Sequence, residues 1–159
     1  MIGQSALAQH LILAGLLTER DCQLIMQDQS HTGQKFAKVT IAMGLFTEQG
    51  LADFLHKRTG YAIISSKDMA MTPQDPLSLL ESSLIEWLEV LPIEKEGGYL
   101  HVAMSDPLDL KTLEQLRFFS ALAIKPRIAK MTELNEAIQH HLEGFKPKTT
   151  FIEGLIYKL

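Results

Sequence analysis

The chain has 159 residues, of which 46% are hydrophobic and 21% are charged, and its formal net charge is −4. This composition is typical of a globular protein with enough apolar residues for one domain or two small ones. The negative charge, without any cluster of Lys and Arg, argues against a protein that binds nucleic-acid phosphates.

The apolar segments are too short for a membrane-spanning helix, which needs about 20 residues. The longest of them, such as residues 11–17, are interrupted by Gly or polar residues, and residues 1–8 lack the basic flank and cleavage site of a signal peptide. The single cysteine, Cys22, has no partner for an internal disulfide, which agrees with a reducing compartment. We therefore expect a cytoplasmic protein without direct membrane insertion, in which Cys22 packs in the core.

An internal repeat occupies the first part of the chain. Residues 7–19 align with residues 36–48 at an offset of 29, and every apolar position of the first copy except Leu11 is apolar in the second. A repeat of this length usually reflects one helical unit that is copied so that neighbours bury each other's apolar faces. The repeat is explained by a packed scaffold alone, although its matched segments could also form one surface for a ligand.

Each copy of the repeat is predicted to be a helix, a tight turn and a second helix. Gly15 and Gly44 stand where the first helix of each copy should end, because glycine adopts a positive φ at little cost. Thr18 and Thr47 follow as caps of the second helices, and each is followed by a Glu that the helix dipole favours. We expect a four-helix unit over residues 6–58.

The middle of the chain changes character after this unit. Residues 61–64 are apolar and predict a strand, and the polar, proline-containing residues that follow as far as Pro76 predict a linker. Leucines and isoleucines at helical spacing predict a helix from Ser78, which also carries Trp87. Its apolar face is too broad for a surface helix, so Trp87 belongs either to the core or to a patch that binds a partner.

The remainder of the chain alternates between strands and helices. Residues 90–104 predict two strands that are joined at Gly97 and Gly98, and residues 124–129 predict a third. Helical spacing returns in residues 108–119, and Thr132 is expected to cap a final helix. We therefore predict an α+β fold, with an N-terminal four-helix repeat unit followed by a small α+β subdomain that contains a mixed sheet of three or more strands.

Three regions follow from these elements. Residues 1–60 form the helical double-motif subdomain and residues 61–144 form the α+β subdomain. Residues 145–159 form a linker or the start of a following region.

The repeat resembles the double motif of the MshEN-type domain, which lies at the amino terminus of type II secretion and type IV pilus assembly ATPases. Each motif of that family spans 24 residues, with a 5-residue spacer between the two, and here residues 6–29 and 35–58 are separated by residues 30–34. The downstream segments at 90–93, 102–110 and 116–118 resemble the second subdomain of the same family.

The resemblance implies a regulatory and docking module rather than an enzyme. Family members usually continue into an ATPase core, but this sequence contains no Gly-x-x-x-x-Gly-Lys-[Ser/Thr] loop to hold nucleotide phosphates. The implied partners are that ATPase core and the cytoplasmic domain of an inner-membrane platform protein, through which the chain would be recruited to the inner membrane. No cofactor is implied.

Many family members bind cyclic di-GMP on the surface that the two motifs form, and the resemblance implies which residues would contact this ligand. Apolar helix ends would hold the guanines and backbone N–H groups would face the phosphates. Carried over position by position, the contacts would come from Leu7, Gly15, Leu16, Leu17, Gln29, Lys35, Phe36, Gly44, Leu45, Phe46 and Arg58.

Several positions depart from the family motif. Ala6 stands where the first motif has a basic residue, Ala8 and Ala37 replace glycines of close approach, and Arg58 replaces a closing Gln. The loss of one charged hydrogen-bonding partner costs about 1.5–3 kcal/mol. These departures predict weak or lost binding unless Lys35 or Arg58 compensates.

The His and Asp residues of the sequence have simple structural explanations. No metal site is expected. His140 and His141 are adjacent and so point to different sides of a helix, and the other four histidines have no Cys or carboxylate partner at ligand spacing: His10, His31, His56 and His101. Asp106 and Asp109 could be a catalytic carboxylate pair, but a turn at Asp106 and a helix start at Asp109 explain their spacing without a substrate. A small hydrolytic enzyme remains a third possibility that rests only on scattered Asp, Ser and His.

Overall fold

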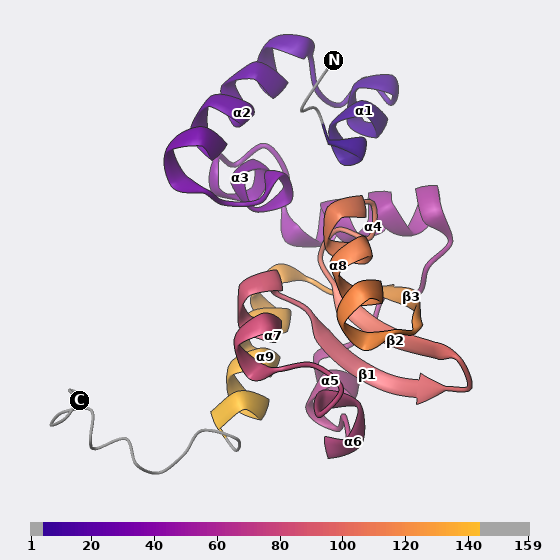
Figure 1. Ribbon diagram of the computed structural model, residues 1–159. Coiled ribbons are helices and arrows are strands. Elements are labelled where there is room, and N and C mark those ends of the chain that lie inside the picture. The colour runs from indigo at the N-terminus through magenta and orange to yellow at the C-terminus, as the bar shows by residue number, and fades with distance from the viewer. Residues whose placement is uncertain (1–4, 144–159) are drawn as a thin grey trace, which may run out of the picture.

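The computed structural model describes residues 5–143, and the expected region 145–159 lies outside them. The first part is helical, as predicted, and comprises α1 (Ala6–Leu13), α2 (Glu19–Thr32), α3 (Phe36–Ala42) and α4 (Glu48–Thr59). In Figure 1 the first three of these helices form one group, and α4 lies between that group and the sheet. We call residues 6–58 the helical unit.

The two copies of the repeat have the same local conformation. Gly15 and Gly44 both have a backbone φ of 76°, a value that residues with a Cβ rarely adopt. Thr18 and Thr47 then cap α2 and α4, each accepting a hydrogen bond from the backbone N–H three residues further on. The predicted turn and the predicted caps are therefore confirmed in both copies.

The middle segment differs from the prediction in two ways. The expected strand at residues 61–64 is a single bridge between Ile63 and Ile128, because the chain turns at Ser65 to begin a helix. The expected linker contains α5 (Ser66–Ala70) and α6 (Gln74–Leu77). The expected helix from residue 78 begins later, as α7 (Ser82–Leu88), because residues 74–77 already form α6.

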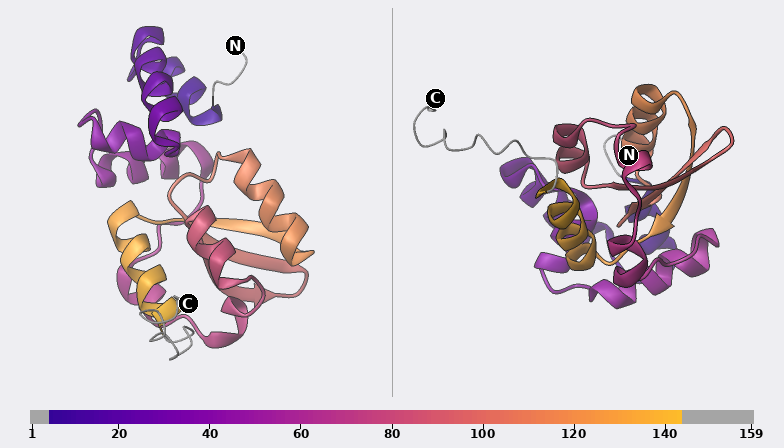
Figure 2. Two further views of the ribbon diagram at one scale, coloured as in Figure 1. Left: turned by 60° about the vertical axis from the view of Figure 1, so that its left-hand side comes forward. Right: turned by 90° about the horizontal axis from the view of Figure 1, so that it is seen from below.

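A three-stranded mixed sheet follows, as predicted. β1 (Leu91–Glu96) and β2 (Tyr99–Met104) are antiparallel, and β3 (Ala123–Ile128) is parallel to β2. Gly97 provides the positive φ of the hairpin turn, and α8 (Leu110–Ser120) makes the crossover to β3. Both views in Figure 2 show α7 and α8 side by side.

The last helix, α9 (Met131–Glu143), packs against β1 and β2. The prediction that Thr132 caps this helix is wrong, because Thr132 lies in its first turn. Its backbone N–H and its hydroxyl donate instead to the two carboxylate oxygens of Glu48, at 2.9 and 2.6 Å. This contact joins the start of α9 to the start of α4.

The buried apolar residues form two clusters. One lies around the sheet and includes Leu91, Leu100 and Leu116, while the other lies within the helical unit and includes Leu7. The helical cluster also contains Ile128 of β3. Cys22 is buried in the helical cluster, as predicted, and this burial raises the pKa of its thiol.

Candidate functional site

The residues that the resemblance assigns to a ligand surface fall into exposed and buried groups. Leu16 and Leu45 lie in the two matching turns and are exposed, at 50% and 38% of their surface. Leu7, Leu17 and Phe36 are buried. Leu16 and Leu45 are therefore accessible to a ligand, whereas Leu7, Leu17 and Phe36 belong to the core of the helical unit.

Arg58 and Lys35 are the two cations of the predicted site, and the structure places them apart. The guanidinium of Arg58 lies 5.5 Å from the ring centroid of Phe54, and the Arg58 side chain is exposed. Lys35 points toward the sheet side of the molecule, where its amine donates to the carbonyl of Leu88 and, at 3.3 Å, to the hydroxyl of Thr112. Lys35 therefore links the helical unit to the ends of α7 and α8.

A cavity of about 780 Å³, here called the cleft, lies where the helical unit meets α7 and α8. It gathers three of the predicted site residues, Gln29, Lys35 and Phe36. The remaining predicted residues do not line it: Leu7, Gly15, Leu16, Leu17, Gly44, Leu45, Phe46 and Arg58.

Asp106 and Asp109 line the cleft. As their spacing predicted, Asp106 forms a turn and Asp109 lies at the start of a helix. The backbone N–H of Leu108 donates to Asp106 in a tight turn, and Asp109 caps α8 by accepting from Thr112. Asp109 also lies 3.7 Å from the amine of Lys35. Burial raises the pKa of the Asp106 carboxyl to about 7, which the hydrogen bond from Leu108 only partly offsets.

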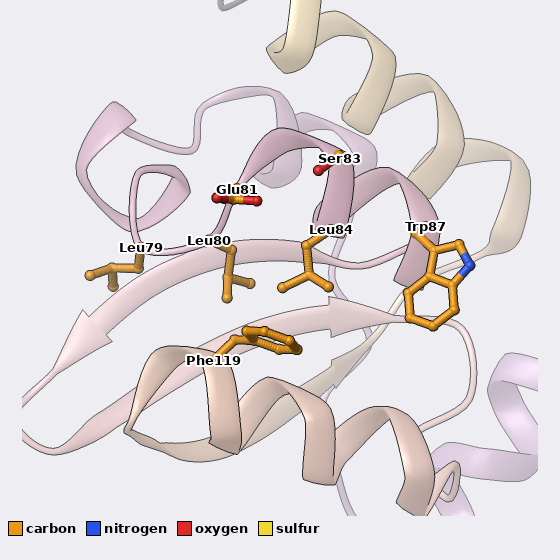
Figure 3. A pocket seen from close by; sticks show the side chains of 7 residues that line it. All are labelled: Leu79, Leu80, Glu81, Ser83, Leu84, Trp87 and Phe119. Carbon is orange, nitrogen blue, oxygen red and sulfur yellow. The ribbon is translucent and has the colours of Figure 1, made fainter.

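A second cavity, of about 570 Å³, lies between α7 and α8 and is called the aromatic groove. Figure 3 shows its lining, which comprises Leu79, Leu80, Glu81, Ser83, Leu84, Trp87 and Phe119. Trp87 is 66% exposed and Phe119 is 53% exposed, whereas Ile85 and Leu88 of the same helix as Trp87 are buried. The apolar face of α7 is therefore divided, with Ile85 and Leu88 in the core and Trp87 at the surface.

Residues 5–143 also bear on metal binding and membrane insertion. Within this range, His, Cys, Asp and Glu side chains do not gather in groups of three that could hold a metal ion. Its helices also fall short of the length and apolarity needed to cross a membrane.

Comparison with known families gives the decisive observation. The family model of the MshEN domain matches residues 59–147, which is more than half of the chain. The chain belongs to the MshEN domain family. The match covers the α+β part, which contains both the aromatic groove and the Asp106 side of the cleft.

Curated relatives of this MshEN chain are type IV pilus assembly ATPases named PilB. The protein from Myxococcus xanthus is 26% identical over 148 residues, and the protein from Thermus thermophilus is 28% identical over 145 residues. The alignments cover 93% and 89% of this chain. They span only 26% and 16% of the relatives' own lengths.

Solved structures support the same placement. A structure of MshE with cyclic di-GMP is 26% identical, has a TM-score of 0.61, and is matched over 84% of this chain and 96% of the other. A structure of the N-terminal domain of XpsE is 19% identical with a TM-score of 0.60, matched over 87% and 98% of the two chains. The XpsE likeness shows the α+β fold, and the MshE likeness includes a ligand-bound relative.

The sequence did not reveal the cleft or the full aromatic groove. Helical spacing placed Trp87 on a broad apolar face but could not show that Phe119 of a separate helix lines the same cavity, opposite Leu80 and Leu84. Asp106 resembled an ordinary turn residue, and nothing in its local sequence indicated that it is buried. The exposed tandem Phe118 and Phe119, whose rings meet edge to face at 5.0 Å, was the one available signal.

Proposed function

We propose that this chain is the non-catalytic N-terminal regulatory and docking module of a type II secretion or type IV pilus assembly ATPase. It docks on the cytoplasmic domain of an inner-membrane platform protein and is recruited to the membrane through that contact. The ATPase core is its other partner. The proposed division at residue 60 separates the double-motif subdomain from the α+β subdomain.

One observation carries this proposal. The PilB relative from Myxococcus xanthus aligns with nearly the whole chain, yet the chain accounts for about a quarter of that relative. A segment that is shared with the ATPases but lacks a nucleotide-phosphate loop supplies regulation or contacts rather than catalysis. The exposed aromatic side chains are consistent with a surface that binds another protein.

A pull-down tests the docking proposal. The chain is immobilised and offered the cytoplasmic domain of the platform protein from the same bacterium at tens of micromolar. We expect retention of that domain, and calorimetry then gives the affinity. No association at this concentration would contradict platform docking, whatever the state of the ligand surface.

The second candidate is a receptor for cyclic di-GMP. It is favoured by the likeness to MshE with cyclic di-GMP and by the equal turns at Gly15 and Gly44, which leave Leu16 and Leu45 at the surface. Against it, Ala8 and Ala37 are buried where the family motif has glycines, and the amine of Lys35 is already hydrogen-bonded within the chain. We therefore expect binding to be weak or lost.

Calorimetry with cyclic di-GMP separates the two functions. A flat trace at tens of micromolar favours the docking module without a ligand. Micromolar binding that disappears in both Leu16→Asp and Leu45→Asp, while Leu24→Asp binds normally, would instead establish the receptor. Leu24 is a matched control because it is similarly exposed, at 42%, and lies outside the two turns.

A further inference from the structure

The aromatic groove and the cleft form one continuous surface. Trp87 lines both cavities, and α7 lies between them. On one side of Trp87 the lining is mainly leucine and Phe119. On the other side it mixes apolar side chains, such as Phe36 and Leu108, with polar and charged ones. An occupant that spans Trp87 would therefore need an apolar face next to polar or charged side chains.

Acidic groups predominate along this surface. The two cavities are lined by the carboxylates Glu81, Glu86, Glu89, Asp106 and Asp109 and by the amines Lys35 and Lys111. Lys35 pairs with Asp109, and Lys38 pairs with Glu89. Asp106 is buried and holds a proton near neutral pH. Among the described residues, the lining carboxylates that are not paired with an amine are therefore those of Glu81 and Glu86, which lie on either side of the start of α7 and are exposed.

The charge distinguishes between the possible occupants. A second copy of this chain carries a net charge of −4 and would bring like charges together at the groove. An anionic lipid surface would be repelled in the same way. A partner with basic side chains gains attraction from the exposed carboxylates of Glu81 and Glu86, which flank the lining of the groove next to Trp87.

The shape of the groove also indicates the form of the partner. A groove between two helices with leucine and aromatic walls accepts the apolar side of an amphipathic helix, whose anchors recur every three to four residues. Its volume of about 570 Å³ is sufficient for several side chains of leucine or phenylalanine size. Trp is also the side chain that most often dominates the affinity of such interfaces.

We propose that the aromatic groove and the adjoining edge of the cleft bind one amphipathic, basic helical segment of a partner protein, with its apolar side against Trp87 and Phe119 and basic side chains next to Glu81 and Glu86. This inference rests on the proposed docking function and specifies where and by what chemistry docking occurs. The platform protein is the partner to which it applies first.

The first test uses the whole chain and the cytoplasmic domain of the platform protein. Trp87→Ala and Phe119→Ser are expected to weaken binding about tenfold or more, because each removes an anchor of the groove. Leu13→Ser is the matched control, since Leu13 is 80% exposed on α1 and lines neither cavity. Its affinity should stay within about twofold of the parent. All three positions are more than half exposed, so folding should be retained, and circular dichroism verifies it.

The second test does not depend on the platform protein. Trp87 is the only tryptophan of the chain, so its fluorescence reports directly on the groove. The probe is a synthetic peptide of about 18 residues, long enough to form a helix, with Leu on one side and Arg on the other. We expect a saturable shift of the Trp87 emission, no shift with the same peptide carrying Glu in place of Arg, and loss of the shift in Phe119→Ser.

The outcomes separate the two proposals. If the platform domain binds but Trp87→Ala and Phe119→Ser bind equally well, the groove inference is wrong and the docking function stands. If the platform domain fails to bind and the Arg peptide still titrates Trp87, the function is wrong and the groove inference stands. The inference is also overturned if neither probe perturbs Trp87, or if Trp87 mediates self-association or binding to vesicles of phosphatidylserine and phosphatidylcholine.

Discussion

Asp106 combines a buried carboxyl group with a single backbone donor among the described residues. Its pKa is raised from 3.8 to about 7, mainly because burial penalises the charged form. The nearby charge of Asp109 adds to this increase, and the charge of Lys35 opposes it. Near neutral pH the folded chain therefore holds a proton on Asp106 that the unfolded chain has lost.

The pH dependence of stability follows from this difference. Below about pH 4, Asp106 is protonated in both states and has no effect. As the pH rises from about 4 to about 7, the free energy of unfolding falls, and the full effect of a shift of this size is about 4 kcal/mol. Above about pH 7 Asp106 is ionised in both the folded and the unfolded chain, and its effect on the free energy of unfolding stays constant.

Asp106→Asn tests this prediction, because the amide oxygen can still accept from Leu108 and the charge is absent. Urea unfolding at several pH values is expected to show the variant gaining stability relative to the parent between about pH 4 and 8, by 2 kcal/mol or more. The two proteins differ at this position alone, so the difference between their free energies of unfolding isolates the effect of Asp106. A difference that does not change with pH would contradict the buried-carboxyl account.

Lys35 provides a second prediction at a single residue. Its amine donates to the Leu88 carbonyl at the end of α7 and to Thr112, and it lies near Asp109. Lys35→Met is expected to lower the free energy of unfolding by about 1–2 kcal/mol, allowing for partial solvent screening. Lys38→Met is the control, because Lys38 is equally exposed but pairs with Glu89 alone; it should cost less than about 0.5 kcal/mol. Equal losses in the two variants would show that the contacts of Lys35 with α7 and α8 add nothing.

The sequence predicted the local roles of residues, such as turns and helix caps, better than it predicted contacts between distant segments. The glycine turns, the caps at Thr18 and Thr47, and the helix start at Asp109 all depend on neighbours within a few positions, and all were confirmed. The contacts of Lys35 with Leu88 and Thr112 join segments that are distant in the chain. No local pattern encodes such contacts.

Among the elements, the two copies of the repeat make the clearest quantitative prediction. Gly15 and Gly44 have equal φ values, and a Cβ added at either position would meet nothing within 4 Å. Any cost of Gly15→Ala or Gly44→Ala therefore comes from backbone strain alone, about 1–2 kcal/mol in each case.

Thermal or urea unfolding measures the two costs, which should agree within about 0.5 kcal/mol. Ala121→Gly is the opposite control, because Ala121 ends α8 with a φ of 60° and glycine relieves that strain. It should raise stability slightly. Clearly unequal costs at Gly15 and Gly44 would mean that the two turns are not equivalent in solution.

Element boundaries failed where packing overrides the local pattern. The apolar run at residues 61–64 has the composition of a strand, but its pairing with β3 stops after one bridge. Pro76 indicated a linker, yet it lies in the short helix α6, four residues long. The β hairpin and the helical repeat were predictable because turn glycines and apolar spacing both indicated the same structure.

At the scale of the whole molecule, the two hydrophobic clusters are joined by specific contacts. Ile128 belongs to β3 but packs in the cluster of the helical unit. Glu48 accepts two hydrogen bonds from Thr132, and Lys130 donates to Gln49 at 3.1 Å. These links cross the proposed division at residue 60, so we expect the two parts to unfold together.

Leu7→Ala tests this coupling, because Leu7 is fully buried in the helical unit and the only tryptophan lies outside that unit, in α7. The cavity that this substitution leaves in the core should lower the free energy of unfolding by about 2–5 kcal/mol. In a cooperative molecule the urea transition of Trp87 fluorescence moves to lower urea concentration together with the transition of far-ultraviolet circular dichroism.

The control is Leu13→Ala, at an exposed position on the same helix. It should change the free energy of unfolding from either transition by no more than about 0.5 kcal/mol. If Leu7→Ala instead gives a biphasic dichroism curve with an unchanged Trp87 transition, the helical unit unfolds independently, and a signal received there would not reach the aromatic groove through shared stability.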